Sequence, residues 1–328
     1  LASPSSSSSS SSSSLPPPKG FEGLIFTPQG DLVGEGGGVR IDRKSSIAWP
    51  SYKAKSPKAK IEEMKDEIIF SSLPPFRFRP REPINKEHYK ISIGGIDGVY
   101  YIPDWVSEEE DQAVRKQLDM TPEHLWGSMR GSRKSIEWGT YTEMSSDYHG
   151  IGYTSMPEWI NEISAQLTNT GIFSDLIHVN TARLNFYNPG QGIPPHVDGD
   201  IYVPKVAMIN LYSSAVFSFY KVDSERLNQT EKEIHQRLTQ AAATGSMDTE
   251  KLLGKPQMSL VLRPRSLVIF EGEAAKKYAH GVAAVKTEVA DPKMIGPIGN
   301  AKLARVKAGE RISRIDRTTI TLRHIMHT

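Results

Sequence analysis

Cysteine is absent from all 328 residues, which excludes disulfides, thiolate metal sites and thiol catalysis together. No apolar run approaches the roughly 18 residues of a membrane-spanning helix, so we expect a soluble protein with no membrane contact. An excess of one charge is also missing, because 40 basic and 38 acidic residues leave a net charge of +2. This balance argues against a protein that coats polyanions with its whole surface. Any metal centre must therefore use His, Asp or Glu.

The first 83 residues are rich in serine, proline and glycine. Residues 5–14 are ten consecutive serines, and residues 16–18 are prolines. Such a segment has too little apolar surface to offset the entropy of ordering. Residues 40–60 hold seven basic residues against one acid, as expected of a solvated linker or of a segment that contacts nucleic acid. We predict a disordered Ser/Pro-rich and basic tail over residues 1–83.

The pattern of an ordered domain begins near residue 88, where residues 98–106 indicate a strand that ends at a turn, and two helices follow. Ser107 with Glu110, and Ser155 with Glu158, are capping-box pairs, each followed by apolar residues at helical spacing. After Gly171 the period changes, and six short β-branched or aromatic segments indicate strands at 177–187, 206–212, 215–221, 257–263, 266–270 and 317–323. This order predicts a mostly β fold, a sandwich or jelly roll with flanking helices. Residues 222–255 are polar and partly helical in pattern, and residues 287–312 lack a period. We expect both segments to be insertions.

A candidate metal site lies in the segment Pro194-Pro-His196-Val-Asp198. Residues two apart in an extended chain face the same way, so His196 and Asp198 can point at one ion. His280, about eighty residues later, ends a strand-like segment and can supply a third ligand. Two histidines and one carboxylate leave open positions on the metal, the arrangement of non-haem Fe(II) oxygenases. By itself the pair also fits an exposed turn with a His–Asp hydrogen bond.

Two further pairs lie at even spacing on expected strands. Asn185 and Tyr187 share one face of a strand that leads into the metal segment, and Arg317 and Arg323 share one face of the last strand. If buried, two arginines need anionic partners, and a dicarboxylate such as 2-oxoglutarate supplies two carboxylates. A half-exposed edge strand with solvated arginines is the alternative.

Together these motifs resemble the AlkB family of Fe(II)/2-oxoglutarate dioxygenases. The motifs are Asn-x-Tyr at 185–187, His-x-Asp at 196–198, His-Gly at 280–281 and Arg-x5-Arg at 317–323, and the likeness spans residues 88–325. The resemblance implies a double-stranded β-helix (jelly roll) core and O2 as a second cosubstrate. It makes His196, Asp198 and His280 the catalytic iron ligands, and Asn185, Tyr187, Arg317 and Arg323 the contacts to 2-oxoglutarate. Thr319 departs from the family, which often has Asn there.

The resemblance also points to alkylated DNA or RNA as substrate, with oxidation of an N-methyl group and loss of formaldehyde. Residues 126–141 mix aromatic and basic residues, a composition suited to a flipped or single-stranded base, although an ordinary core fits them too. We predict substrate contacts from Arg133, Lys134, Trp138 and Tyr202. We also expect a monomer in the nucleus and cytoplasm. A nucleic-acid-binding module with little turnover, a protein-directed hydroxylase or demethylase, and a cupin-fold hydrolase or isomerase remain alternatives.

Overall fold

The computed structural model describes residues 24–26, 32–34, 77–128, 133–144, 149–222 and 253–326. The chain divides into two compact units, residues 1–56 and 57–328. In the first unit, strands β1 (Leu24–Phe26) and β2 (Leu32–Gly34) pair antiparallel. The rest of the predicted tail up to residue 76, and most of the predicted insertion 222–255, lie outside the described residues.

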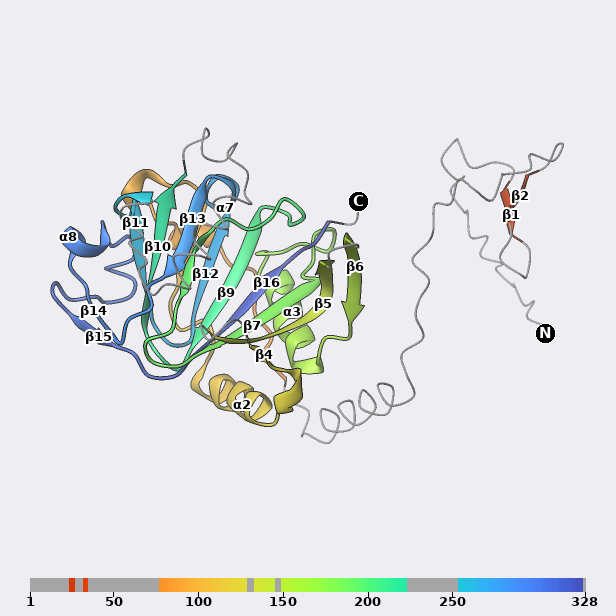
Figure 1. Ribbon diagram of the computed structural model, residues 1–328, viewed down its shortest axis with the longest axis horizontal. Helices are drawn as coiled ribbons and strands as arrows, with labels where there is room; N and C mark the ends of the chain where they lie inside the picture. Colours follow the sequence, from red (N-terminus) through yellow and green to blue (C-terminus); the bar gives the residue numbers. More distant parts are fainter. Residues whose placement is uncertain are drawn as a thin grey trace, which may run out of the picture. The chain divides into compact units, whose positions relative to one another are not determined.

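Two antiparallel sheets form the core of the second unit (Figure 1). The large sheet has the order β3-β12-β9-β16-β7-β5-β4, with β6 paired to β5, and the small sheet has the order β11-β10-β13-β8. The large sheet contains β3 (Val99–Ile102), β4 (Gly127–Ser128), β5 (Lys134–Met144), β6 (His149–Thr154), β7 (Thr181–Tyr187), β9 (Lys205–Leu211), β12 (Ser266–Glu271) and β16 (Arg317–Arg323). The small sheet contains β8 (Ile193–His196), β10 (Ala215–Lys221), β11 (Met258–Leu262) and β13 (Tyr278–Val282). The predicted jelly roll is confirmed, and all six predicted strands are present.

Helices cover the outer face of the large sheet. Helix α2 (Glu108–Asp119) begins with the predicted capping box, in which Ser107 and Glu110 bond reciprocally. Helix α3 (Glu158–Asn169) buries its apolar stripe as predicted, but its N-cap is Pro157, so the capping box expected from Ser155 is wrong. The other helices within the described residues are one turn long: 3₁₀ turns η1 (Lys86–Tyr89), η2 (Ile93–Gly95) and η3 (Glu123–Leu125), and α7 (Glu273–Lys276) and α8 (Pro292–Ile295).

The strand registers align one polar row across the inner face of the large sheet. Side chains paired between neighbouring strands form the row Ser135, Asn185, Thr319, Asn210 and Ser266. One residue along each strand lies an apolar row on the helix-covered face: Ile136, Leu184, Ile320, Ile209 and Leu267. Because successive side chains in a strand alternate between faces, the polar row faces the small sheet. The space between the two sheets therefore has a polar wall.

The ordered domain starts earlier than the predicted residue 88. Phe78 is 2% exposed within the helix-side core, and Arg81 pairs with Glu110 of helix α2. Residues 77–85 pack without regular secondary structure, so no hydrophobic period in the sequence indicates them.

The predicted insertion at 287–312 is also a packed part of the domain. Strands β14 (Thr287–Val289) and β15 (Arg311–Ser313) pair antiparallel, and Ile312 and Ala290 join a small apolar cluster with Val216 and Val261. Its strands are three residues long, too short to produce a detectable alternation.

Candidate metal centre

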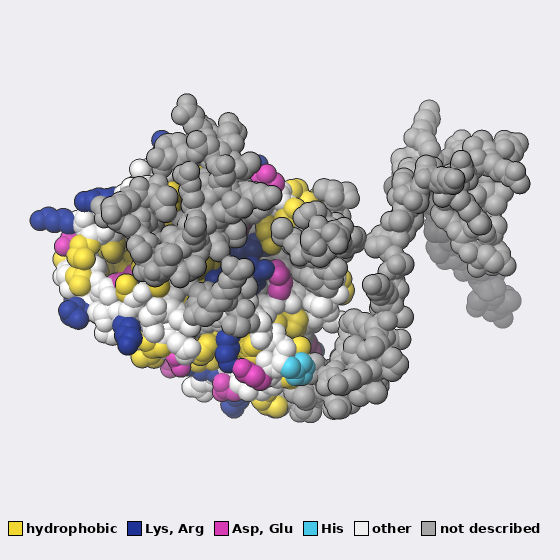
Figure 2. All heavy atoms as spheres, viewed as in Figure 1, with side chains coloured by type: hydrophobic (Ala, Val, Ile, Leu, Met, Phe, Trp, Pro, Cys, Tyr) yellow, Lys and Arg dark blue, Asp and Glu magenta, His cyan; other side chains and the backbone are white. Residues whose placement is uncertain are grey.

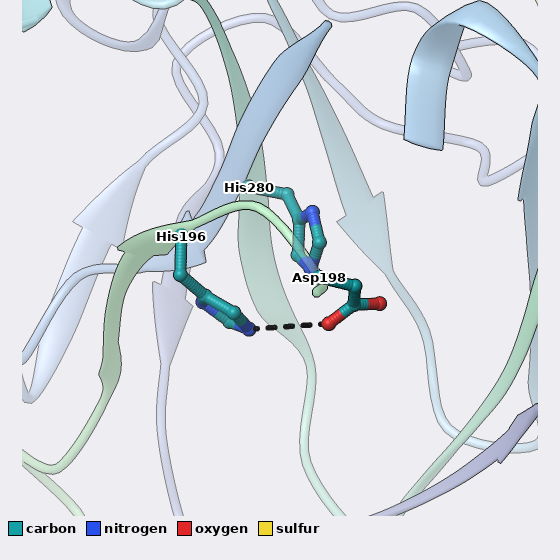
Figure 3. Close-up of side chains that lie close together, drawn as sticks. All are labelled: His196, Asp198 and His280. Carbon is teal, nitrogen blue, oxygen red and sulfur yellow. Dashed lines mark ion pairs between the residues drawn. The ribbon is translucent and has the colours of Figure 1, made fainter. Parts of the chain in front are cut away.

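The structure brings the three predicted metal ligands together between the sheets. His196 is the last residue of β8, Asp198 follows in the next turn, and His280 lies on β13 opposite His196 in the strand register. One ligand atom from each side chain lies within 4.8 Å of the other two. Figure 3 shows the three side chains pointing toward one another, with His196 Nε2 3.8 Å from Asp198 Oδ1. This triangle can hold one ion.

Burial sets the protonation states that a metal requires. His280 is 4% exposed and packs against the ring of Phe270, and burial, followed by the neighbouring His196, lowers its pKa to about 3. Burial also lowers the pKa of His196. Burial raises the pKa of Asp198, but Arg323 and the histidines outweigh this and hold it below its usual value. The site thus offers two neutral imidazoles and one carboxylate at neutral pH.

The free atoms of the triad fit a divalent metal. His196 Nδ1 lies 2.9 Å from the Pro194 carbonyl, which orients the ring and leaves Nε2 for an ion. Buried His280 Nδ1 and Asp198 Oδ2 have no hydrogen-bond partner among the described residues, although Asp198 Oδ2 lies 3.2 Å from Arg323 Nε. Such orphaned buried atoms need an explanation, and a metal-ligating role is one.

Close packing of β8 on β13 explains the glycine after His280. A Cβ at Gly281 would lie 2.7 Å from the backbone nitrogen of Pro195 and 2.8 Å from the Ile193 oxygen. A side chain there would push β8 away from β13, and His196 would move with β8. The glycine of the His-Gly motif therefore allows β8 to lie close enough to β13 for His196 and His280 to share one ion.

Arg317 is a buried cation on the inner face of the large sheet. It is 2% exposed, its guanidinium lies 4.2 Å from the centre of the Tyr187 ring, and it donates to Asn210 Oδ1 at 3.2 Å. Burial lowers its pKa. No carboxylate of the described residues lies at ion-pair distance from it. A buried charge without a counterion is unfavourable in free energy, so we expect Arg317 to bind an anion from outside the chain.

The other predicted cosubstrate residues lie on the same inner face. Arg323 approaches Asp198 from β16. Asn185 is paired with Thr319 across β7 and β16, and its Oδ1 accepts a hydrogen bond from Arg133 Nε at 2.9 Å. The structure therefore collects the predicted metal and cosubstrate residues on facing walls of one site.

Of the four predicted substrate contacts, the structure places two near this site. Arg133 reaches it through Asn185, and the Tyr202 ring lies 4.8 Å from the Arg323 guanidinium. Trp138 instead lies in the core on the helix-covered face, edge-on to Trp159, and Lys134 pairs with Glu123. Their even positions on β5 turn both side chains to the face opposite the site.

Sequence reasoning missed two residues of the site. Asn210 orients Arg317, and its presence as a polar residue in an otherwise apolar strand was a usable signal. Arg183 shares the inner face of β7 with Asn185, pairs with Glu137 at 2.7 Å and contributes to the low pKa of Asp198. Its even spacing from Asn185 and Tyr187 could have identified it.

A jelly roll holding a His-Asp-His triad opposite two inward-facing arginines defines a non-haem iron oxygenase class of site. Residues 98–323 match the model of the 2OG-Fe(II) oxygenase superfamily. The chain belongs to this superfamily, so its metal is Fe(II) and its cosubstrates are 2-oxoglutarate and O2. It is a dioxygenase.

Two sequence relatives support the AlkB resemblance. The chain is 28% identical over 227 residues to the zebrafish (Danio rerio) protein named "Probable RNA/DNA demethylase ALKBH6", covering 69% of this chain and 85% of that protein. It is 22% identical over 245 residues to the Xenopus tropicalis "tRNA (carboxymethyluridine(34)-5-O)-methyltransferase alkbh8", covering 70% of this chain and 32% of that protein. Among solved structures, OsALKBH1 matches with a TM-score of 0.42 and 13% identity over 69% of this chain and 98% of that one.

None of the helices among the described residues has the length and apolar character needed to span a membrane.

Proposed function

We propose that this dioxygenase removes alkyl groups oxidatively from nucleic acid. When bound, the iron and 2-oxoglutarate supply oxidation of a C–H bond by O2, with release of succinate and CO2. On an N-methyl group this oxidation gives a hemiaminal that loses formaldehyde. The chain's own residues provide three metal ligands and a buried cation for the cosubstrate. The rings of Phe217, Phe219 and Phe270 pack around His280 and keep water from that side of the site.

The observation that carries the substrate proposal is a surplus of cations around the triad. Four arginines lie on or next to the inner faces of β5, β7 and β16, namely Arg133, Arg183, Arg317 and Arg323, against the carboxylates of Asp198 and Glu137. The charges of Fe(II) and of 2-oxoglutarate cancel, so two positive charges remain in the loaded site. Such a surplus favours an anionic substrate.

The surface agrees with this distribution. Figure 2 shows dark-blue Lys or Arg side chains over strand β16 in the middle of the view, beside an acidic one. The side chain of Arg183 is 33% exposed, so part of this charge reaches solvent. Phosphates flanking an alkylated base would meet these cations, whereas a neutral peptide would not use them.

The test supplies purified protein with Fe(II), 2-oxoglutarate and O2, and offers N-methylated oligonucleotides and N-methylated peptides in parallel. We expect succinate and formaldehyde in equal amounts from an oligonucleotide, and neither product from the His196→Ala/Asp198→Ala control. Coupled turnover with peptides alone would replace the proposal with the protein-directed alternative. Oligonucleotide binding that persists in the control, with no succinate from the wild type, would support the binding module instead.

A further inference from the structure

Arg133 is a second buried cation near the site, and its hydrogen-bond partner among the described residues is the neutral amide of Asn185. Its side chain is 9% exposed, and its Nε donates to Asn185 Oδ1 at 2.9 Å. Burial lowers the pKa of this guanidinium. Among the described residues no carboxylate lies at ion-pair distance from it. Burial of a guanidinium without a counterion is unfavourable in free energy. A role at the site would explain why the cation is kept there.

The bond from Arg133 fixes which way the Asn185 amide points. Arginine carries only donors, so the amide atom that faces it must be the oxygen. The NH2 group of Asn185 is then turned away from Arg133. No hydrogen bond among the described residues uses this NH2 group, and Asn185 lies on the inner face between Arg183 and Tyr187. The amide thus has N–H donors available on the wall of the large sheet that faces the triad.

The neighbouring strand increases the importance of this amide. Thr319 is paired with Asn185 across β7 and β16, so its hydroxyl is the polar group beside this amide on the inner face. A threonine hydroxyl is shorter and has a single donor. Asn185 is therefore the side chain of this pair that can donate two hydrogen bonds.

We propose that Arg133 is a positioning residue of the cosubstrate site, which holds the Asn185 amide so that its NH2 group donates to a carboxylate of 2-oxoglutarate. The inference rests on the proposed function, because 2-oxoglutarate is a cosubstrate of that reaction. It assigns Arg133 to the cosubstrate rather than to the nucleic acid. Arg133 then acts through Asn185 and does not touch the substrate. It also explains why a buried arginine has an amide as its partner.

The test is a double-mutant cycle on the binding of 2-oxoglutarate to the full chain loaded with Fe(II) without oxygen, followed by the visible charge-transfer band. We expect Arg133→Met and Asn185→Ala each to raise the dissociation constant about tenfold, the size of one lost hydrogen bond that involves a charge. The double variant should be no weaker than Asn185→Ala alone. Arg133→Lys, which keeps a donor and the charge, should recover much of the affinity.

Two further variants keep the test decisive. Asn185→Asp retains the oxygen that faces Arg133 but loses the NH2 group, so it should bind 2-oxoglutarate at least as weakly as Asn185→Ala. Arg115→Met removes a cation from helix α2, where Arg115 pairs with Asp111, and should leave the dissociation constant unchanged. Fe(II) affinity without 2-oxoglutarate should be the same in every variant.

Additive losses in the double variant, or a normal dissociation constant in Arg133→Met with a raised KM for the oligonucleotide, would overturn the inference and make Arg133 a direct ligand contact. Absence of the band in the wild-type protein would instead reject the cosubstrate site as a whole. Turnover of peptides with the expected 2-oxoglutarate effects would reject only the proposed substrate. The failures are therefore distinguishable.

Discussion

Arg323 Nε lies 3.2 Å from Asp198 Oδ2, so an arginine from the last strand of the large sheet holds the carboxylate that completes the metal triad. Both side chains are about nine-tenths buried, with exposed fractions of 9% and 10%. The pair fixes the orientation of Asp198 before any metal arrives. Partners of metal ligands commonly change metal affinity by 10–100-fold when altered.

The first prediction concerns this pair. Arg323→Gln should lower Fe(II) affinity by about 10–100-fold, because Asp198 loses the cation that orients it and holds its pKa down. The measurement is metal titration followed by intrinsic fluorescence, without 2-oxoglutarate. Arg317→Gln is the matched control, since Arg317 contacts Tyr187 and Asn210 rather than Asp198. Equal losses in both variants would contradict the assignment.

A second prediction follows from the burial of Arg317 without an acidic partner. Arg317→Met should change the free energy of unfolding of the ligand-free protein by less than about 1 kcal/mol, because relief of an uncompensated charge offsets the lost bond to Asn210. The same variant should lose the stabilisation that 2-oxoglutarate confers on the wild type. Thermal unfolding with and without 2-oxoglutarate measures both effects. A strongly destabilised ligand-free variant would show that Arg317 has a structural role.

The third prediction tests the placement of Trp138 and Lys134 on the helix side of β5. Trp138→Ala should cost about 3–5 kcal/mol of stability, because it empties a buried contact with Trp159. Lys134→Ala should cost about 0–1 kcal/mol and leave the KM for the oligonucleotide unchanged, since its pair with Glu123 is largely exposed. Denaturant unfolding and steady-state kinetics separate the two effects. A raised KM for the oligonucleotide in Lys134→Ala would show that Lys134 contacts the substrate.

A fourth prediction concerns pH and the carboxylate of Glu271, which Lys86 and Lys205 share. Burial raises its pKa, but the two lysines outweigh burial and hold it below the ordinary 4.5. A lowered folded-state pKa gives stability that is present above the unfolded value and is lost as the pH falls through the folded value. Glu271→Gln should therefore cost about 1–2 kcal/mol at pH 7, and the deficit should shrink below about pH 4.5. A deficit independent of pH would contradict this.

Much of the site was predictable because its residues lie at even spacing on strands. Asn185 and Tyr187, and Arg317 and Arg323, share faces by the two-residue alternation of extended chains, and alternation is visible in a sequence. The approach of His280 to His196 was not visible, because it depends on the pairing of β8 with β13. The AlkB resemblance supplied that link, and the structure agrees with it.

The errors have physical causes as well. Trp138 and Lys134 were grouped with Arg133 by composition, but the strand that starts at Lys134 turns them to the helix side. The helix start at Pro157 was misassigned because Ser155 and Glu158 have the right spacing without the right backbone. Segments without a period, such as the one around Phe78, gain their order from contacts with distant residues, which local patterns do not contain.

The polar row across the large sheet also bears on how this chain folds. A slip of one residue of β9 or β16 against its neighbours would carry Asn210 or Thr319 into the helix-packed core and would place Ile209 or Ile320 at the cosubstrate site. Each such error would leave a buried amide or hydroxyl without a hydrogen-bond partner. Sheets with the wrong register would therefore be short-lived intermediates. The residues that prepare the site for catalysis therefore also select the correct strand alignment before the sheet closes.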